Sequence, residues 1–220
     1  MQREIITTDD GSKTIRIKDW DEQYHSKHGA IQEAYHVFIK HGLDLFKNQD
    51  VHILEIGFGT GLNALITLLE TSKSKFKIEY YGVEAFPITR EELFQLNYIS
   101  ALKAKHFKKQ FALMHSAPWH EQVALSDGFL LYKKQCGFTE ITYEALFNLI
   151  YFDAFGARVQ PELWKEDMFT IMFKALKKGG VLVTYAAKGS VRRAMHAVGF
   201  TVERLPGPPG KREMLRAIKP

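Results

Sequence analysis

The sequence contains a single cysteine, Cys136, among 220 residues. One thiol can form neither an internal disulfide nor a zinc site with several thiolates, so we expect a protein of a reducing compartment. Long apolar runs are also absent, and no apolar stretch follows a basic start at the N-terminus. The sequence therefore predicts neither a signal peptide nor a transmembrane helix, and we expect a cytoplasmic protein.

Linker-like segments are missing too. Only seven prolines occur, and no Pro/Gly/Ser-rich tract is long enough to separate two domains. A single domain of this size buries roughly 70% of the surface that its unfolded chain exposes. We therefore predict one domain over residues 1–220, in which residues 1–24 form an N-terminal appendage and residues 25–220 the core.

Acidic residues are scarce in the last part of the chain. The whole sequence carries 30 Lys and Arg against 25 Asp and Glu, a net charge of +5. From Lys174 onward, eleven Lys and Arg stand against only Glu203 and Glu213, so this part carries +9 and the rest −4. Such asymmetry predicts a localised basic surface that suits a polyanionic partner.

The pattern of apolar residues predicts an α/β fold. Two alternating runs flank a turn within residues 4–18, which predicts an N-terminal β-hairpin. Short apolar runs then alternate with helical patterns, which is typical of a parallel sheet with helices on both faces. A helix is expected from Pro161 to Leu176, and residues 201–219 resemble a closing β-hairpin with an antiparallel strand. The predicted parallel strands are residues 51–56, 77–84, 148–153 and 181–187.

The first of these strands runs into three alternating glycines, Gly57, Gly59 and Gly61. Glycine lets a backbone turn tightly and approach a ligand, and the helix N-terminus follows closely. Dinucleotide enzymes use G-x-G-x-x-G, but here Leu62 occupies the last position and Gly61 comes one residue early. The loop therefore indicates a nucleotide-type cofactor other than a dinucleotide, and a tight turn without a ligand is the alternative.

Three acidic residues lie in or after predicted strands, where ligands bind in open α/β sheets. Glu84 is placed to accept hydrogen bonds from both hydroxyls of a ribose; the alternative is a solvated carboxylate. Glu55 would complement a cationic group such as the amino group of S-adenosylmethionine, because a buried acid without a partner is costly. Asp153 would face the reactive end of the cofactor, unless it only caps the following turn.

Other residues carry weaker signals. Arg192 and Arg193 open a helix and suit phosphate binding, although solvated surface arginines are an equal alternative. His25 and His28 have helical spacing but no clustered Cys or carboxylate, so no metal site is predicted. Aromatic residues near the strand ends are expected mostly in the core; they are Phe152, Phe155 and Trp164.

Five segments together resemble the MnmC-like tRNA (5-methylaminomethyl-2-thiouridine) methyltransferase family: LEIGFGTGLNAL, YGVEAFPITREEL, LIYFDAFGARVQPELW, GGVLVTYAAKGSVRRAMHAVGF and GPPGKREMLRA. The segment containing Tyr24 and Glu33 to Phe38 is also similar to that family. The resemblance implies a class I S-adenosylmethionine-dependent methyltransferase fold, a Rossmann-like doubly wound sheet with an antiparallel edge strand. It also implies methylation of the 5-aminomethyl group of a modified (2-thio)uridine at the tRNA wobble position.

The resemblance assigns roles to particular residues. Asp153 would lie at the site of methyl transfer. The family tends to place Gly-Asp after the third strand, near the adenine, whereas this chain reads LLYKKQCGFTE there, which leaves Gln135 or Cys136 as candidates for the adenine contact. S-adenosylmethionine would be held by Tyr24, Glu33, Glu55, Gly57, Phe58, Gly59, Thr60, Gly61, Asn63 and Glu84. Independently of the resemblance, the basic charge near the C-terminus predicts that tRNA phosphates are bound by Lys188, Arg192, Arg193, Lys211 and Arg212.

Two-domain relatives carry a flavin oxidoreductase for which this length leaves no room, so we expect a stand-alone methyltransferase without FAD or metal. Two alternatives stay open: a polyamine-type aminopropyltransferase and a non-catalytic RNA-binding module on the same fold. The oligomeric state is also open, with a monomer favoured.

Overall fold

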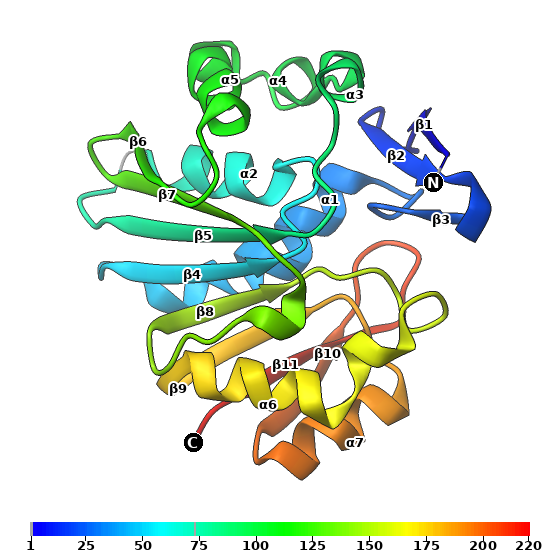
Figure 1. Ribbon diagram of the computed structural model, residues 1–220, viewed down its shortest axis with the longest axis vertical. Coiled ribbons are helices and arrows are strands. Elements are labelled where there is room, and N and C mark those ends of the chain that lie inside the picture. The colour runs from blue at the N-terminus through cyan, green and yellow to red at the C-terminus, as the bar shows by residue number, and fades with distance from the viewer. Residues whose placement is uncertain (1, 73) are drawn as a thin grey trace.

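A mixed eight-stranded sheet forms the centre of the molecule in a computed structural model that describes residues 2–72 and 74–220 (Figure 1). The strand order is β10-β11-β9-β8-β4-β5-β7-β6. The strands are β4 (Val51–Ile56), β5 (Ile78–Glu84), β6 (Gln122–Ser126), β7 (Phe129–Gln135), β8 (Phe147–Phe152), β9 (Leu176–Thr184), β10 (Thr201–Pro206) and β11 (Glu213–Ile218).

The five central strands of this sheet, β9, β8, β4, β5 and β7, pair in parallel. The predicted closing hairpin is confirmed, because β10 and β11 pair with each other and β11 pairs antiparallel with β9. A second antiparallel strand, β6, lies at the opposite edge beside β7. The sequence did not predict β6, because most of its side chains are exposed and its apolar run is only Val123 to Leu125.

Strand bounds agree with the prediction most closely at β4, which covers Val51–Ile56 as expected. The prediction was wrong around β9, which begins at Leu176 and ends at Thr184, not at residue 187. Gly179 and Gly180 do not separate a helix from this strand but lie within it, where Gly179 has φ +74° and the pairing of β8 with β9 shifts register.

The helix expected from Pro161 to Leu176 is interrupted. Pro161 begins a short 3₁₀ helix, η6 (Pro161–Trp164), and α6 (Glu166–Ala175) starts after it. Trp164 turns back at this break, and its indole Nε1 donates to the carbonyl of Phe155 over 2.7 Å. The proline therefore starts a separate turn at the carboxyl edge of the sheet.

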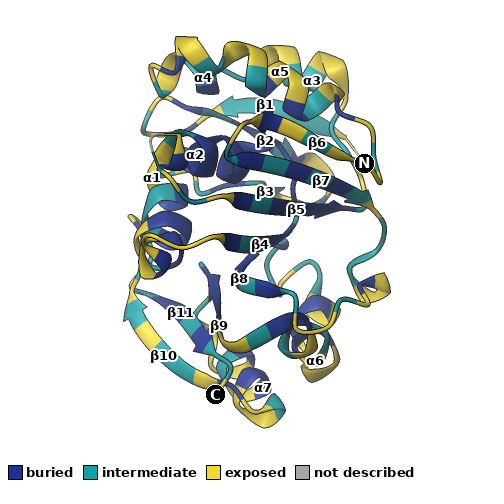
Figure 2. Cartoon of the chain, turned by 90° about the vertical axis from the view of Figure 1, so that its left-hand side faces the viewer, coloured by how far each residue is buried: buried dark blue, intermediate teal, exposed yellow. Residues whose placement is uncertain are grey.

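Helices cover both faces of the sheet, which confirms the predicted doubly wound α/β architecture (Figure 1). One apolar core lies under the helices of the first half, and a second lies under α6 and α7. Dark-blue buried residues follow the strands between these layers in Figure 2. The remaining helical elements are α1 (Ala30–Ala34), η2 (Tyr35–Lys40), η3 (Leu43–Phe46), α2 (Leu62–Thr71), α3 (Arg90–Gln95), α4 (Tyr98–Ala101), η4 (Lys105–Phe107), α5 (Lys108–Ser116), η5 (Phe138–Glu140) and α7 (Gly189–Val198).

The N-terminal segment forms a small sheet of its own. The predicted hairpin is confirmed as β1 (Arg3–Thr7) and β2 (Lys13–Ile17), and β3 (Glu22–Gln23) follows η1 (Lys18–Trp20) as a third strand. Arg3 donates to the carbonyl of Phe86, just beyond β5. The small sheet therefore lies beside the carboxyl ends of the main sheet (Figure 1).

Candidate functional site

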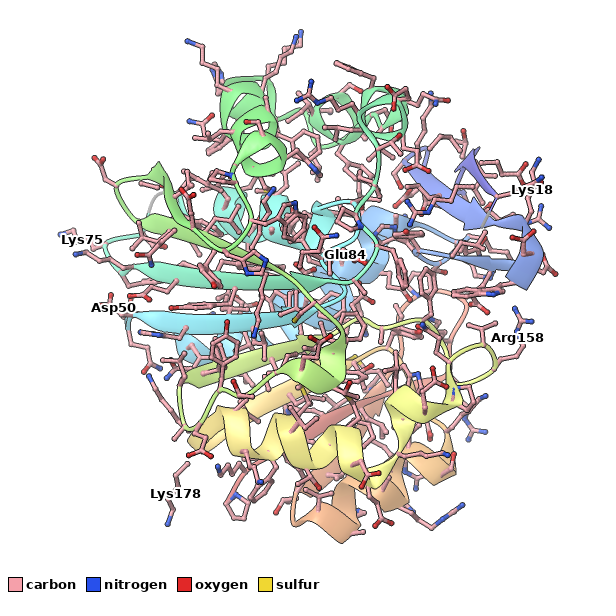
Figure 3. All side chains as sticks on the ribbon, viewed as in Figure 1. Lys18, Asp50, Lys75, Glu84, Arg158 and Lys178 are labelled. Carbon is pink, nitrogen blue, oxygen red and sulfur yellow. The ribbon has the colours of Figure 1, made fainter. Side chains whose placement is uncertain are left out.

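A cavity of about 580 Å³ lies at the carboxyl ends of the central strands. Its wall combines residues that follow β4, β5 and β8 with residues from the N-terminal sheet and from the loop between β10 and β11. Glu84, labelled in Figure 3, lies in this region. Most of the predicted cofactor residues line the cavity: Tyr24, Glu33, Glu55, Gly57, Phe58, Gly59, Thr60, Asn63 and Glu84.

The glycine loop between β4 and α2 has a backbone that requires glycine. Gly57 has φ +89°, and a Cβ there would lie 2.7 Å from the carbonyl oxygen of Asp153. Gly59 has φ +47° and faces the ring of Tyr24, which a Cβ would approach to 3.0 Å. Gly61 precedes α2 in the left-handed conformation and does not itself line the cavity. The loop is thus shaped jointly by β8 and by the N-terminal segment.

Glu84 holds this loop from the end of β5. One carboxylate oxygen accepts a hydrogen bond from the backbone N–H of Gly59 (2.9 Å), and the other accepts from that of Phe86 (2.8 Å). The side chain is buried but lines the cavity. Since each carboxylate oxygen can accept two hydrogen bonds, both keep one for a ligand.

Asn63, in the first turn of α2, connects two further carboxylates. Its amide nitrogen donates to Glu55 and to Asp153, over 2.9 Å in each case. Among the described residues, the second oxygen of Glu55 is buried without a well-formed hydrogen bond, with the hydroxyl of Tyr80 close by. Burial raises the pKa of Glu55 well above its usual range. A cationic ligand group beside this oxygen would satisfy both its charge and its missing hydrogen bond.

Asp153 is the first residue after β8 and lines the cavity. Burial, together with the nearby charge of Glu33, raises the pKa of Asp153 to about 7; the hydrogen bond from Asn63 and the charge of Lys211 oppose this shift. The carboxylate can therefore gain or lose a proton near neutral pH, as a base must.

Glu33 and Lys211 meet across the cavity wall, although they lie far apart in the sequence. The Lys211 ammonium donates to one oxygen of Glu33 and lies 3.9 Å from the centroid of the Tyr185 ring. The other oxygen of Glu33 accepts from the backbone of Ser26 over 2.7 Å. Lys211, predicted at an RNA surface, is thus placed inside the candidate site.

The other predicted RNA-binding residues lie outside the cavity. Lys188, Arg193 and Arg212 are exposed, and Arg192 is partly exposed at the start of α7. Gln135 and Cys136, the predicted adenine contacts, do not line the cavity either. The residues that follow them do line it: Gly137, Phe138 and Thr139.

Aromatic side chains divide between core and cavity. Phe152 and Trp164 are buried in the core, as expected. Phe155 lines the cavity and packs edge-on against Tyr24, with ring centroids 5.0 Å apart. Tyr185, which the sequence analysis missed, donates from its hydroxyl to the carbonyl of Ala154 over 2.8 Å. Its place directly after the end of β9 was the signal that could have found it.

The cavity is rich in acid. Among the described residues, six side chains that line it carry carboxyl groups: Glu22, Glu33, Glu55, Glu84, Asp153 and Glu162. Three described cationic side chains line it as well: Arg3, Lys27 and Lys211. His25 also lines it and is buried, with Nδ1 2.8 Å from the Thr14 hydroxyl. Within the described residues, no group of three or more His, Cys, Asp or Glu side chains is placed to hold a metal ion. The lining favours a cationic ligand.

Comparisons with known proteins show what this chain is similar to. Residues 137–220 match a family described as S-adenosyl-L-methionine-dependent methyltransferases. The bifunctional protein MnmC of tRNA 5-methylaminomethyl-2-thiouridine biosynthesis from Hydrogenovibrio crunogenus is 28% identical over 96% of this chain, and that from Leptospira interrogans is 31% identical over 90%. The crystal structure of MNMC2 from Aquifex aeolicus is 27% identical in sequence and superposes with a TM-score of 0.76. The match covers 98% of this chain and 70% of the MNMC2 chain. The predicted resemblance to the MnmC-like methyltransferase family is confirmed.

The predicted class I methyltransferase fold is confirmed by the same comparisons, and S-adenosylmethionine is the cofactor of the family that matches. The chain spans about a third of the length of these MnmC proteins, 33% and 32%. Spermidine synthase from Thermotoga maritima is 14% identical, with a TM-score of 0.57, and the match covers 99% of this chain and 72% of the synthase chain. At this level of identity the similarity shows the fold alone. Among the described residues, none of the helices is long and apolar enough to cross a membrane.

Proposed function

We propose that this chain is an S-adenosylmethionine-dependent N-methyltransferase that converts the 5-aminomethyl group of a modified wobble uridine in tRNA to 5-methylaminomethyl. The observation that carries the proposal is Asp153, an acid with its pKa near neutrality, set against the glycine loop in an acid-lined cavity. The similarity to MnmC proteins supports the choice of RNA over a free amine. We further infer one catalytic unit over residues 1–220, with residues 1–24 appended to a core of 25–220, in the cytoplasm.

The cavity wall fits this cofactor. Glu84 would accept hydrogen bonds from the ribose hydroxyls with the free lone pairs of its oxygens. Glu55 would bind the ammonium group through its second oxygen, which is buried without a well-formed hydrogen bond. The loop from Gly57 to Gly61 would let the backbone approach the ligand, and Tyr24 and Glu33 would close the wall. When bound, the cofactor supplies an electrophilic methyl group on a sulfonium.

The side chains contribute position and proton transfer. Methyl transfer to an amine requires a neutral nitrogen with its lone pair aimed along the line of attack, so close orientation accounts for most of the rate. Asp153, oriented by Asn63, would accept a hydrogen bond from the acceptor nitrogen and then its proton. The cationic side chains outside the cavity, Lys188, Arg192, Arg193 and Arg212, would hold tRNA phosphates.

The acid-rich lining also suits a polyamine-type aminopropyltransferase, which would take a small cationic substrate. The two candidates differ in their products. Purified protein is incubated with labelled S-adenosylmethionine and precursor tRNA that carries the 5-aminomethyl group, and in parallel with decarboxylated S-adenosylmethionine and putrescine. We expect labelled 5-methylaminomethyluridine in nucleoside mass spectra and no polyamine; the reverse result would overturn the proposal.

The matched variants for this assay are Asp153→Asn and Asp127→Asn. Asp127 is an exposed residue between β6 and β7. Asn at 153 keeps the size of the side chain but removes its charge and its capacity as a base, so single-turnover methylation should fall roughly 10²–10⁴-fold. Asp127→Asn should methylate as the wild type does. Wild-type rates for Asp153→Asn would make Asp153 a turn-capping residue only.

A further inference from the structure

A second basic region lies far from the C-terminal one. No Asp or Glu occurs within residues 96–120, a stretch that contains four lysines. These are Lys103, Lys105, Lys108 and Lys109, and His106 lies among them. All five side chains are exposed. In the part of the chain that the structure describes, the ion-paired lysines are Lys18 and Lys211, so the four lysines of this cluster have no carboxylate partner within 4.0 Å.

The elements that carry this cluster are anchored in the core. Tyr98 of α4 and Phe111 and Met114 of α5 are buried. The hydroxyl of Tyr98 also donates to Thr60 in the glycine loop over 3.0 Å. The outer faces of α3, α4 and α5 are yellow in Figure 2, which marks exposed residues. The lysines therefore project from elements that buried side chains anchor to the core.

Exposed aromatic rings connect this surface with the cavity. Phe86, 60% exposed, lines the cavity just after β5. Phe94 on α3 is 85% exposed. Arg3 links the two regions, since it donates to the carbonyl of Phe86 and forms an ion pair with Glu92 of α3. The elements that carry Phe94 and the lysines lie on the same side of the molecule (Figure 1). Exposed aromatic rings and cations on one surface can bind RNA together, since bases stack on the rings and phosphates bind the cations.

We propose that the outer surface of α3 to α5, formed by Phe94, Lys103, Lys105, Lys108 and Lys109, binds the RNA backbone outside the cavity. The inference rests on the proposed function in that the RNA is the tRNA substrate, whose target nucleotide would occupy the cavity. The lysines would contact phosphates without regard to sequence, and Phe94 would stack on an unpaired base. The substrate would thus be held on both sides of the cavity, by α7 and the last hairpin and by α3 to α5.

The test replaces the four lysines of the cluster together by alanine. The control replaces four other exposed lysines, Lys40, Lys47, Lys75 and Lys77, which changes the net charge equally. Lys75 lies at the edge of the molecule away from Glu84 (Figure 3). Binding of precursor tRNA and of an unmodified tRNA transcript is measured by filter binding at several salt concentrations, and S-adenosylhomocysteine binding by calorimetry verifies the fold.

We expect the cluster variant to bind both RNAs about tenfold or more weakly and to lose about three units of the salt slope, since each phosphate contact contributes about 0.7–0.9. Phe94→Ala should bind RNA about fivefold more weakly with an unchanged salt slope. The control Leu45→Ala changes another exposed apolar residue and should bind RNA as the wild type does. Unchanged affinity and slope in the cluster variant would overturn the inference. So would lysine-dependent binding to vesicles of anionic lipid without an effect on RNA.

These outcomes are separable from the proposed function. If wild-type protein does not methylate precursor tRNA, the proposed function fails, and tRNA binding still reports on the surface. If methylation occurs but the cluster variant binds and methylates tRNA as the wild type does, only the surface assignment fails.

Discussion

Asn63 donates a hydrogen bond to Asp153 over 2.9 Å, and the second proton of the same amide bonds Glu55. One neutral side chain thereby links two neighbouring carboxylates at the cavity wall. Its hydrogen bond favours the ionised form of Asp153, against burial and the charge of Glu33. Asn63 is therefore placed to tune the proton affinity of the proposed base.

Asn63→Ala should move the pH dependence of methylation to higher pH. With the hydrogen bond removed, the pKa of Asp153 rises above its value of about 7, so the ionised form appears only at higher pH. Single-turnover rates between pH 5 and 10 measure this shift. Asn148→Ala, which removes an asparagine bonded to His52 and Lys177, is the control. An unchanged midpoint in Asn63→Ala would contradict the role of Asn63.

Asp153→Asn should stabilise the fold while it slows methylation. The pKa of Asp153 is raised from 3.8 to about 7, so the native state binds a proton that the unfolded chain has lost, and wild-type stability falls as pH rises between these values. Each pKa unit corresponds to about 1.4 kcal/mol, and because Asp153 is partly open to the cavity we expect a gain of roughly 1–3 kcal/mol at pH 8. Urea unfolding should show this gain at pH 8 and none below about pH 4. Equal gains in unfolding free energy at both pH values would contradict the raised pKa of Asp153.

Glu84→Gln should weaken cofactor binding. A carboxamide has one oxygen, so either Gly59 or Phe86 loses its backbone partner, and the negative charge for the ribose hydroxyls is lost. We expect the binding free energy of S-adenosylhomocysteine to become about 1–3 kcal/mol less favourable. Calorimetry measures it, with Glu79→Gln in the same strand as the control. Wild-type affinity in a folded Glu84→Gln protein would remove Glu84 from the site.

Gly57→Ala and Gly179→Ala separate backbone strain from steric conflict. Both glycines have positive φ, +89° and +74°, but a Cβ at Gly179 meets nothing within 4 Å, whereas one at Gly57 meets the Asp153 carbonyl at 2.7 Å. Gly179→Ala should cost only the left-handed strain, about 1–2 kcal/mol. Gly57→Ala should cost more and also weaken cofactor binding. Equal losses in urea unfolding, with unchanged affinity, would contradict the close approach of the loop and β8.

Lys211→Met should destabilise the protein, because it leaves the buried carboxylate of Glu33 without its counter-ion. The side chains of Glu33 and Lys211 are 7% and 32% exposed, and we expect a loss of roughly 1–3 kcal/mol in unfolding free energy. The double variant Glu33→Gln/Lys211→Met should recover part of it, as a double-mutant cycle would measure. The same cycle on the exposed pair Arg16 and Asp21 should show little coupling. Additive effects at Glu33 and Lys211 would contradict the ion pair.

Local sequence determined most of the elements of this protein and the bounds of β4. Runs of apolar residues interrupted by glycine specify β4 and its loop, because a buried strand and a left-handed turn are each encoded within a few residues. The position of Asp153 directly after β8 follows from the same pattern. The sequence alone therefore predicted the doubly wound fold and named many of the residues that line the cavity.

Tertiary structure alone decided which of these residues meet. Lys211 pairs with Glu33 across 178 positions, and Asn63 bonds Asp153 across 90. Such contacts depend on how distant loops pack against one another at the end of the sheet. Local sequence patterns do not predict that packing. Strand β6 was not predicted because its side chains are mostly exposed. Its hydrogen bonds with β7 define it, and these also depend on the tertiary structure. Apolar periodicity reports burial against a core, whereas polar pairing across a cavity is fixed only when separate elements pack together.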